Sequence, residues 1–291
     1  SENFYSKEIS AVKNVNLTVP KTNSSWLMSG MNPQNFLGNI YLSGIENNFL
    51  KKKIGKNKFS ISKSILSPVI SNNNIIFSDN AGTIFNINQR GKVNWKKNIY
   101  KKIYKKIFKN LTLSIYKDKI YVADNIGFIY AISLESGKLI WIKNHGIPLK
   151  SNVKVFNNRL FLINQDSRLI CLDIDGGSKI WDVRSVSSFI KSQHSLALSI
   201  SKEGDIVILN SSGDLLKIKS NNGRIYWSLN TLGSMLAHDT DFFKSSDIVI
   251  TNENIIFSTQ SSIFSYNLNS GYTNWKRDVS SVAAPIVDGK N

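Results

Sequence analysis

Residues 137–141 read Gly-Lys-Leu-Ile-Trp, and the same Gly-x-x-x-Trp pattern occurs four more times along the chain. The five copies are Gly91–Trp95, Gly137–Trp141, Gly177–Trp181, Gly223–Trp227 and Gly271–Trp275. Their tryptophans follow one another at intervals of 46, 40, 46 and 48 residues. A recurring interval of this length indicates a repeat architecture, in which each copy is one structural unit.

The second repeat shows what one unit contains. Short runs rich in β-branched and aromatic residues occupy 111–115, 120–123, 128–132 and 138–141. Turn residues separate these runs, as in Asp124–Gly127, where the glycine is free to adopt positive φ. Four short strands in each repeat of 40–48 residues are typical of a propeller blade. The sequence therefore predicts an all-β fold, a β-propeller of four-stranded blades.

The tryptophans and glycines of the pattern have a structural role in this interpretation. One blade cannot bury both faces of its sheet, so blades stack around an axis and large apolar side chains fill the space between them. We expect all five tryptophans to be buried between blades, and each glycine to permit the tight turn before the fourth strand.

The two ends of the chain predict an incomplete ring. Residues 284–287 (Ala-Pro-Ile-Val) match the opening of the first repeat at 67–70, and the chain stops after this one strand. Residues 47–54 look like the last strand of a blade that lacks its first three strands. We expect a leader at 1–45 and a propeller at 46–291, with five full blades and part of a sixth, in a fragment of a longer protein.

The net charge of +17 comes from 37 Lys and Arg residues against 20 Asp and Glu residues. The abundance of Lys, Asn, Ile and Ser is typical of an AT-rich coding sequence, and no nucleic-acid-binding motif accompanies the charge, so we expect no binding to nucleic acid. Seven lysines lie between Lys96 and Lys109, with apolar residues near a helical period. This segment is either a lysine-rich blade connection whose aromatic residues cover the blade edge, or a basic amphipathic turn for an anionic membrane or an acidic partner.

No catalytic or metal-binding constellation stands out. The single cysteine, Cys171, falls in a predicted strand and reads as a small buried thiol. His145, His194 and His238 are far apart in the sequence and fall in blade connections. The run from Asp173 to Gly177 is similar to the start of a calcium-binding loop but lacks the later ligands of such a loop. We expect no catalytic residue, no metal and no cofactor.

On these repeats the chain resembles the PQQ-like repeat family and, within it, the BamB proteins of the alphaproteobacterial type. The segment Trp26–Gly30 is similar to the one that precedes the propeller in those relatives. The resemblance implies an eight-bladed, non-enzymatic scaffold at the periplasmic face of the outer membrane of a Gram-negative bacterium. It implies a protein partner, the barrel-inserting subunit of the β-barrel assembly machinery, and membrane attachment only through a lipid anchor that this chain lacks.

Two alternatives remain open: a PQQ-dependent dehydrogenase-like enzyme, or another PQQ-repeat binding protein. Quinoprotein dehydrogenases have an adjacent Cys-Cys disulfide, which one cysteine cannot form. The resemblance to BamB places the partner surface on two blade connections. The first carries Phe189, Ile190 and Lys191, and the second carries Asp239 and Asp241.

Overall fold

The structure is a computed structural model. It describes residues 16–44, 48, 50–56, 67–184, 194–232 and 244–289. The described chain consists of β-strands, irregular segments and one short 3₁₀ turn at Lys102–Tyr104 (η1). Within these residues there is no helix that is long and apolar enough to cross a membrane.

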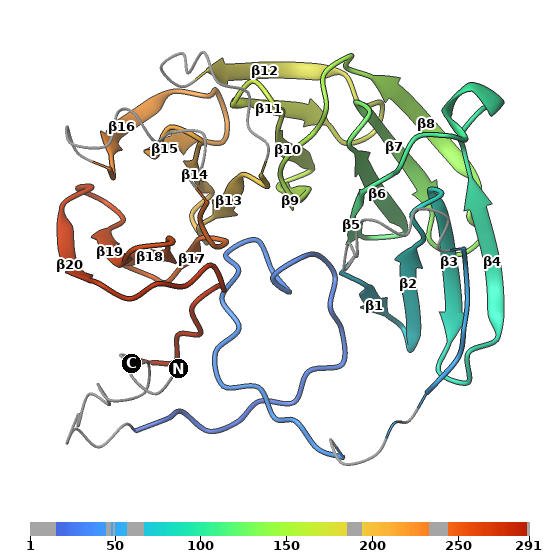
Figure 1. The fold of residues 1–291 in the computed structure, drawn as a ribbon, viewed down its shortest axis with the longest axis horizontal. Coiled ribbons are helices and arrows are strands. Elements are labelled where there is room, and N and C mark those ends of the chain that lie inside the picture. Colours follow the sequence, from blue (N-terminus) through green and yellow to red (C-terminus); the bar gives the residue numbers. More distant parts are fainter. Residues whose placement is uncertain are drawn as a thin grey trace, which may run out of the picture.

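In the described residues, twenty strands form five separate four-stranded antiparallel sheets, and each sheet is one blade (Figure 1). Blade 1 contains β1 (Val69–Ser71), β2 (Asn74–Ser78), β3 (Thr83–Asn88) and β4 (Val93–Asn98). Blade 2 contains β5 (Leu111–Tyr116), β6 (Lys119–Asp124), β7 (Phe128–Ser133) and β8 (Leu139–Asn144). Blade 3 contains β9 (Lys154–Phe156), β10 (Arg159–Ile163), β11 (Arg168–Asp173) and β12 (Lys179–Arg184). Blade 4 contains β13 (Ala197–Ile200), β14 (Asp205–Leu209), β15 (Asp214–Lys219) and β16 (Ile225–Asn230). Blade 5 contains β17 (Val249–Ile250), β18 (Asn254–Ser258), β19 (Ile263–Asn267) and β20 (Thr273–Arg277). The predicted all-β propeller of four-stranded blades is confirmed.

Each tryptophan of the repeat follows a bulge in the fourth strand. In blade 2, Ala131 pairs with Trp141 and the next residue of β7, Ile132, pairs with Leu139, so Ile140 has no partner in β7. The register shifts at the equivalent place in the other four blades. An extra residue bends the strand and changes the direction of the side chains beside it. The bulge therefore accompanies the outward turn of the tryptophan toward the next blade.

The indole of one blade lies on the signature glycine of the next. A Cβ atom on Gly177 would come 2.5 Å from the Trp141 ring, and one on Gly137 would come 2.7 Å from the Trp95 ring. Gly223 and Gly271 have the same relation to Trp181 and Trp227, at 2.9 and 3.0 Å. These glycines have φ between 67° and 75°, which allows the turn before the fourth strand, but the space above them is equally decisive.

The indole nitrogen adds a hydrogen bond to this contact. Trp95 donates to the carbonyl oxygen of Leu134 at 3.0 Å, and Trp141 donates to that of Ile174 at 3.1 Å. Each acceptor lies three residues before the glycine that the ring covers. Trp181 lacks this bond: its ring nitrogen is buried with no partner, and the guanidinium of Arg159 donates instead to the equivalent oxygen, that of Ser220.

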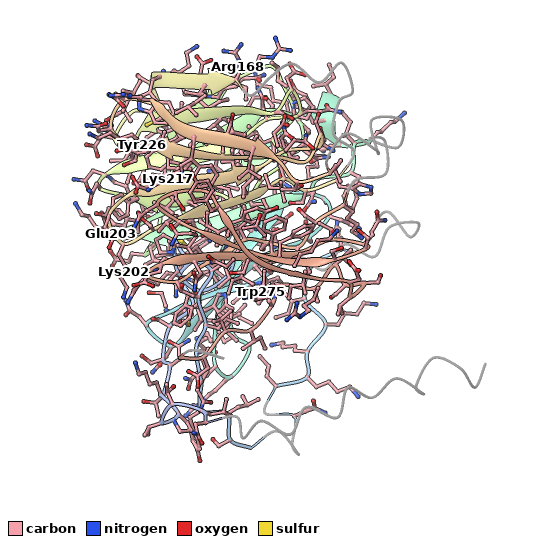
Figure 2. All side chains as sticks on the ribbon, turned by 90° about the vertical axis from the view of Figure 1, so that its left-hand side faces the viewer. Arg168, Lys202, Glu203, Lys217, Tyr226 and Trp275 are labelled. Atoms are coloured by element: carbon pink, nitrogen blue, oxygen red, sulfur yellow. The ribbon has the colours of Figure 1, made fainter. Side chains whose placement is uncertain are left out.

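The apolar core is divided into layers between consecutive blades. One layer joins blades 2 and 3 with Trp141 at its edge, the next joins blades 3 and 4 with Trp181, and a third joins blades 4 and 5 with Trp227. The expectation that all five tryptophans are buried between blades holds only in part. Four of the rings are half-buried, while Trp275 is 39% exposed on the outermost strand of blade 5 (Figure 2). Trp275 is exposed because no further blade covers it among the described residues.

The five blades form an open arc, and the ring is not closed (Figure 1). Between blades 5 and 1 lie irregular segments from both ends of the chain, joined by hydrogen bonds of the Thr18 backbone N–H and hydroxyl to the carboxylate of Asp288. Val287 packs against blade 5, as a first strand of a following blade would, but it belongs to no sheet.

Residues 50–56 run along blade 1 beside its outer strands (Figure 1) without forming the strand that the sequence predicts at 47–54. They take the place of a preceding blade's fourth strand. Leu50 would lie 2.9 Å from a Cβ atom on Gly91, and the ammonium of Lys52 donates to the Gly91 carbonyl oxygen at 2.8 Å. Residues 50–56 form no strand because no third strand of the described chain lies beside them to pair with.

Replacing Trp141 by Ala tests the contact between blades. Because Trp141 is half-buried and bonded to the next blade, we expect the W141A variant to lose about 3 kcal/mol of unfolding free energy. The matched W275A variant removes an exposed ring and should lose about 1 kcal/mol or less. Chemical denaturation followed by circular dichroism measures both, and equal losses would contradict the assigned contact.

Cys171 provides a second test of the packing. Its side chain is fully buried in β11, and burial raises the pKa of its thiol to about 12, so hardly any thiolate forms near neutral pH. We expect no reaction with Ellman's reagent in the folded protein and one equivalent after unfolding in guanidinium. Rapid labelling of the folded chain would show that β11 is accessible and would overturn this placement.

Candidate functional site

The inner edge of the arc is already occupied by the chain's own N-terminal segment. Residues 26–36 (here called the inner leader) meet the first strand of each blade in order, from blade 1 to blade 5. The contacts are Trp26 with Ile70 of β1, Leu27 with Ile115 of β5, Ser29 with Lys154 of β9, Pro33 with Ile200 of β13 and Gln34 with Ile250 of β17. In Figure 1 this segment is the blue loop inside the arc.

Most of these contacts join backbone groups. The backbone N–H groups of Ile115, Ile200 and Ile250 donate to leader carbonyl oxygens at 2.6, 2.9 and 3.0 Å. The side-chain amide of Asn35 adds bonds to backbone carbonyl oxygens of blades 4 and 5. Buried backbone groups need such partners, and here the leader supplies them.

Lys154 holds the middle of the inner leader. Its side chain is fully buried, and its ammonium donates to the carbonyl oxygens of Ser29 (2.7 Å) and Asn32 (3.0 Å) and to the side-chain oxygen of Asn35. Burial lowers the pKa of Lys154 from 10.5 to about 7, while the charge of Asp247 acts to raise it. A buried ammonium needs several acceptors, and this one obtains all three from one loop, so Lys154 ties the leader to blade 3.

Figure 2 looks at the arc edge-on and shows its two faces at left and right. The chain enters each blade at its inner strand and leaves at its outer strand, so all the connections between blades lie on one face. Segment 99–110 belongs to this face, between β4 and β5. Lys202 and Glu203, in the turn between β13 and β14, lie at the left edge, on the opposite face.

The five predicted partner residues, Phe189, Ile190, Lys191, Asp239 and Asp241, lie outside the described residues. Their segments, 185–193 and 233–243, connect β12 to β13 and β16 to β17. The ends of both segments therefore lie on the same face as segment 99–110. This common face follows from the four-strand repeat, although the spacing of the loops in the sequence does not make it obvious.

The lysine-rich segment is a blade connection whose aromatic residues turn inward. The Tyr100 hydroxyl donates to the Asp124 carboxylate, and the Tyr100 and Tyr104 rings meet Phe128 edge-on at 6.4 and 5.5 Å between centroids. The only helical structure is the short turn η1. The aromatic residues therefore cover the edge of a blade, here blade 2, as one alternative expected. The outer side of the same turn is basic, so the contact with an anionic membrane or an acidic partner stays a prediction.

The acidic turn at Asp173 has a structural role. One carboxylate oxygen of Asp173 accepts the backbone N–H groups of Asp175 and Gly176, and Asp175 forms an ion pair with Lys119 at 3.2 Å. Across the described ranges, no group of three or more His, Cys, Asp or Glu side chains is placed to hold a metal ion.

The sequence signal for the inner leader was weak, because its contacts are to residues at least 44 positions away.

Replacing Lys154 by Met keeps a long side chain but removes all three bonds to the inner leader. We expect the K154M variant to be cut by a nonspecific protease within residues 26–36, while the wild-type chain resists under the same conditions. A K202M variant on the opposite face is the control. Mass spectrometry of the fragments locates the cut, and an uncut leader in a folded K154M variant would contradict this role for Lys154.

The comparisons with known proteins agree with this fold. A family model described as "Outer membrane protein assembly factor BamB" matches residues 80–291. Outer membrane protein assembly factor BamB from Moranella endobia is 23% identical over 138 residues, which are 44% of this chain and 34% of the relative. BamB from Yersinia pestis is 21% identical over 197 residues, 66% of this chain and 47% of the relative. In these matches the chain spans between a third and a half of its curated relatives.

Among solved structures, quinohemoprotein alcohol dehydrogenase from Comamonas testosteroni superposes with a TM-score of 0.64 at 12% identity, covering 89% of this chain and 49% of that one. At this identity the likeness shows the propeller fold alone. The family match covers more than two thirds of the sequence, with β3 and β4 of blade 1 and all of blades 2 to 5. The chain belongs to the outer membrane protein assembly factor BamB family of PQQ-type repeat proteins.

Proposed function

We propose that this chain belongs to a non-enzymatic scaffold that binds the barrel-inserting subunit of the outer-membrane β-barrel assembly machinery. The scaffold acts at the periplasmic face of the outer membrane and uses no cofactor. Residues 1–45 serve as its leader and residues 46–291 as its propeller portion. Family membership supports the assembly role, and the curated relatives, which are longer than the matched region, are named as assembly factors.

The observation that carries the non-enzymatic part of the proposal is the inner leader. An enzyme of this fold needs room inside the ring for a cofactor, with polar side chains that converge on it. Here one backbone N–H group in each of β5, β13 and β17 and the ammonium of Lys154 in β9 are bonded to residues 26–36. This leaves the outer connections between blades as the surface available for recognition.

The partner surface in this proposal is the face that carries the blade connections. Phe189 and Ile190 beside Lys191 form a small apolar group next to a charge, which is how a binding hot spot is typically composed. Asp239 and Asp241 contribute opposite charge from the following connection. The described residues that flank both segments lie on one face, which supports a single partner domain that contacts both.

The second candidate function is a quinoprotein dehydrogenase-like enzyme, which the fold of the Comamonas testosteroni enzyme keeps open. Titration of the purified chain with PQQ and calcium separates the two functions. The scaffold proposal expects no bound quinone chromophore and no turnover of alcohols with an artificial electron acceptor. A stable quinone spectrum with turnover would establish the enzyme and would refute the scaffold.

Substitution of the first loop tests the partner surface. The triple variant F189A/I190A/K191E should lose about tenfold or more in affinity for the periplasmic region of the barrel-inserting subunit, because hot-spot truncations commonly cost 2 kcal/mol or more. The variant D239N/D241N should lose less, about threefold, since rim charges contribute little. Surface plasmon resonance with the immobilised partner region measures both affinities.

The control variant is K202E, which changes a charge on the opposite face of the arc (Figure 2). It should bind the partner as the wild-type chain does. If the triple variant folds and binds with unchanged affinity, the partner surface lies elsewhere, and if the wild-type chain shows no binding, the proposed partner is wrong.

A further inference from the structure

The positive charge of this protein is concentrated in one part of the chain. Residues 50–110 contain 15 of the 37 basic residues and one of the 20 acidic residues, so they carry +14 of the net +17. Fourteen of these basic residues are lysines, and the single acid is Asp79. A lysine excess that came only from codon usage would be spread along the sequence. The concentration in blade 1 and its flanking segments therefore calls for a local explanation.

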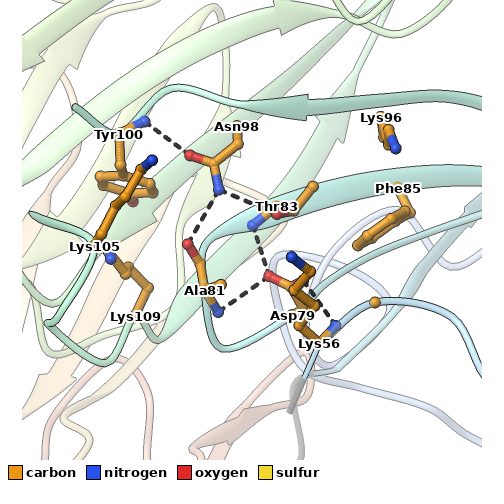
Figure 3. Close-up of a pocket in the computed structure, with 11 residues that line it drawn as sticks. Lys56, Asp79, Ala81, Thr83, Phe85, Lys96, Asn98, Tyr100, Lys105 and Lys109 are labelled. Carbon is orange, nitrogen blue, oxygen red and sulfur yellow. Dashed lines mark hydrogen bonds between the residues drawn. The ribbon is translucent and has the colours of Figure 1, made fainter. Parts of the chain in front are cut away.

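The structure brings two of these lysine-rich segments together. Residues 50–56 run beside blade 1, and residues 96–106 lead from β4 into the connection to blade 2. Both segments line one cavity of about 960 Å³, to which they contribute Lys56, Lys96 and Lys105 (Figure 3). We call the exposed lysines of 50–56 and 96–106, with this cavity, the lysine face.

The cavity has a net positive charge. Besides the three exposed lysines it is lined by Lys109, which is 1% exposed and lies 5.0 Å from the centre of the Tyr100 ring. Among the described residues, the only carboxylate in its wall is that of Asp79, which accepts the backbone N–H groups of Lys56, Ala81 and Thr83 at 2.8–3.1 Å. The Lys109 ammonium donates to the carbonyl oxygen of Tyr104. Since four lysines line the cavity together with one carboxylate that already accepts three hydrogen bonds, the charge of its wall favours an anion.

The outer surface of the connection is both apolar and basic. Ile103 is 78% exposed and Ile107 is 42% exposed, and lysines occupy 101, 102, 105 and 106 around them. Their aromatic neighbours Tyr100 and Tyr104 pack on blade 2 and hold the connection in place. Exposed aliphatic residues between lysines are the pattern of segments that lie in the headgroup region of anionic membranes.

Other anionic partners fit this face less well. Proteins that bind single-stranded nucleic acid present exposed aromatic rings for base stacking, whereas the aromatic rings of this connection turn inward. Specific recognition of a carboxylate or phosphate group on a peptide favours the planar fork of arginine, and the only arginine among residues 50–110 is Arg90. Lysines, as compact point charges, suit a diffuse anionic surface.

We propose that the lysine face binds an anionic phospholipid membrane, with a lipid phosphate in the cavity and with Ile103 and Ile107 in the headgroup region. The chain then has its own contact with the membrane, beyond the single lipid anchor expected from the sequence. This proposal does not depend on the identity of the protein partner. Because the lysine face includes segment 99–110, the membrane contact lies on the same face as the other blade connections.

Vesicle co-sedimentation with the full 291-residue chain tests this proposal. We expect binding to vesicles of phosphatidylglycerol and phosphatidylcholine, no binding to phosphatidylcholine alone, and release at high salt, which screens exposed charges. The variant K96Q/K101Q/K102Q/K106Q should bind the anionic vesicles about tenfold or more weakly. The matched variant K138Q/K143Q/K202Q/K219Q removes four exposed lysines from the other blades and should bind within about twofold of the wild-type chain.

The variant I103S/I107S separates insertion from charge. It should weaken vesicle binding severalfold while leaving the salt dependence unchanged, because it removes apolar contact and no charge. Circular dichroism and the protection of Cys171 from labelling confirm that each variant is folded. Equal losses in the two quadruple variants, unchanged binding by I103S/I107S, or no binding of the wild-type chain to anionic vesicles would each overturn the proposal. Tighter binding to mixed-sequence RNA or to polyglutamate than to the vesicles would assign the face to that ligand instead.

Discussion

The contact between the tryptophan of one blade and the glycine of the next is the constraint on which the rest of the structure depends. It requires a bulge before the tryptophan and a carbonyl acceptor three residues before the glycine of the next blade. It also requires that this residue be glycine, because an added Cβ atom would lie only 2.5–3.0 Å from the ring. The bulge and the ring belong to one blade, whereas the glycine and the acceptor belong to the next, so one blade cannot make this contact alone. This is why the same five-residue pattern must recur along the chain, and why the last ring of the series, Trp275, is left exposed.

A second set of contacts runs inside the arc and connects all five blades to one segment. Blade-to-blade contacts fix only neighbours, whereas residues 26–36 touch the inner strands of every blade in turn. The buried ammonium of Lys154 is central to this arrangement, because removing its three acceptors would leave a charge without partners in the interior. The same contacts fill the inner edge of the arc, so one segment both connects the blades and occupies the space between their first strands.

The sequence predicted the blades well and the leader poorly, for a physical reason. Strand alternation and the Gly-x-x-x-Trp pattern are local, and they gave the four-strand units and the place of each tryptophan relative to its own blade. Packing between blades decides which glycine each ring contacts, such as Gly177 for Trp141. It also decides that Arg159, and not Trp181, donates to the equivalent carbonyl oxygen. The path of the leader depends on polar contacts with distant residues, which leave no periodic signal. The charge excess of residues 50–110 is visible in the sequence, but the sequence does not show that two separate segments of this region line one cavity.

The proposed function depends on the inner leader filling the interior of the arc. Amide hydrogen exchange tests this most directly, read at Ile115, Ile200 and Ile250, whose backbone N–H groups donate to the leader. The account predicts that these three amides are protected in the wild-type chain as strongly as the central strands, and that all three lose protection together in a chain that begins after residue 44. Rapid exchange at these positions in the intact chain, or protection that persists without the leader, would contradict it.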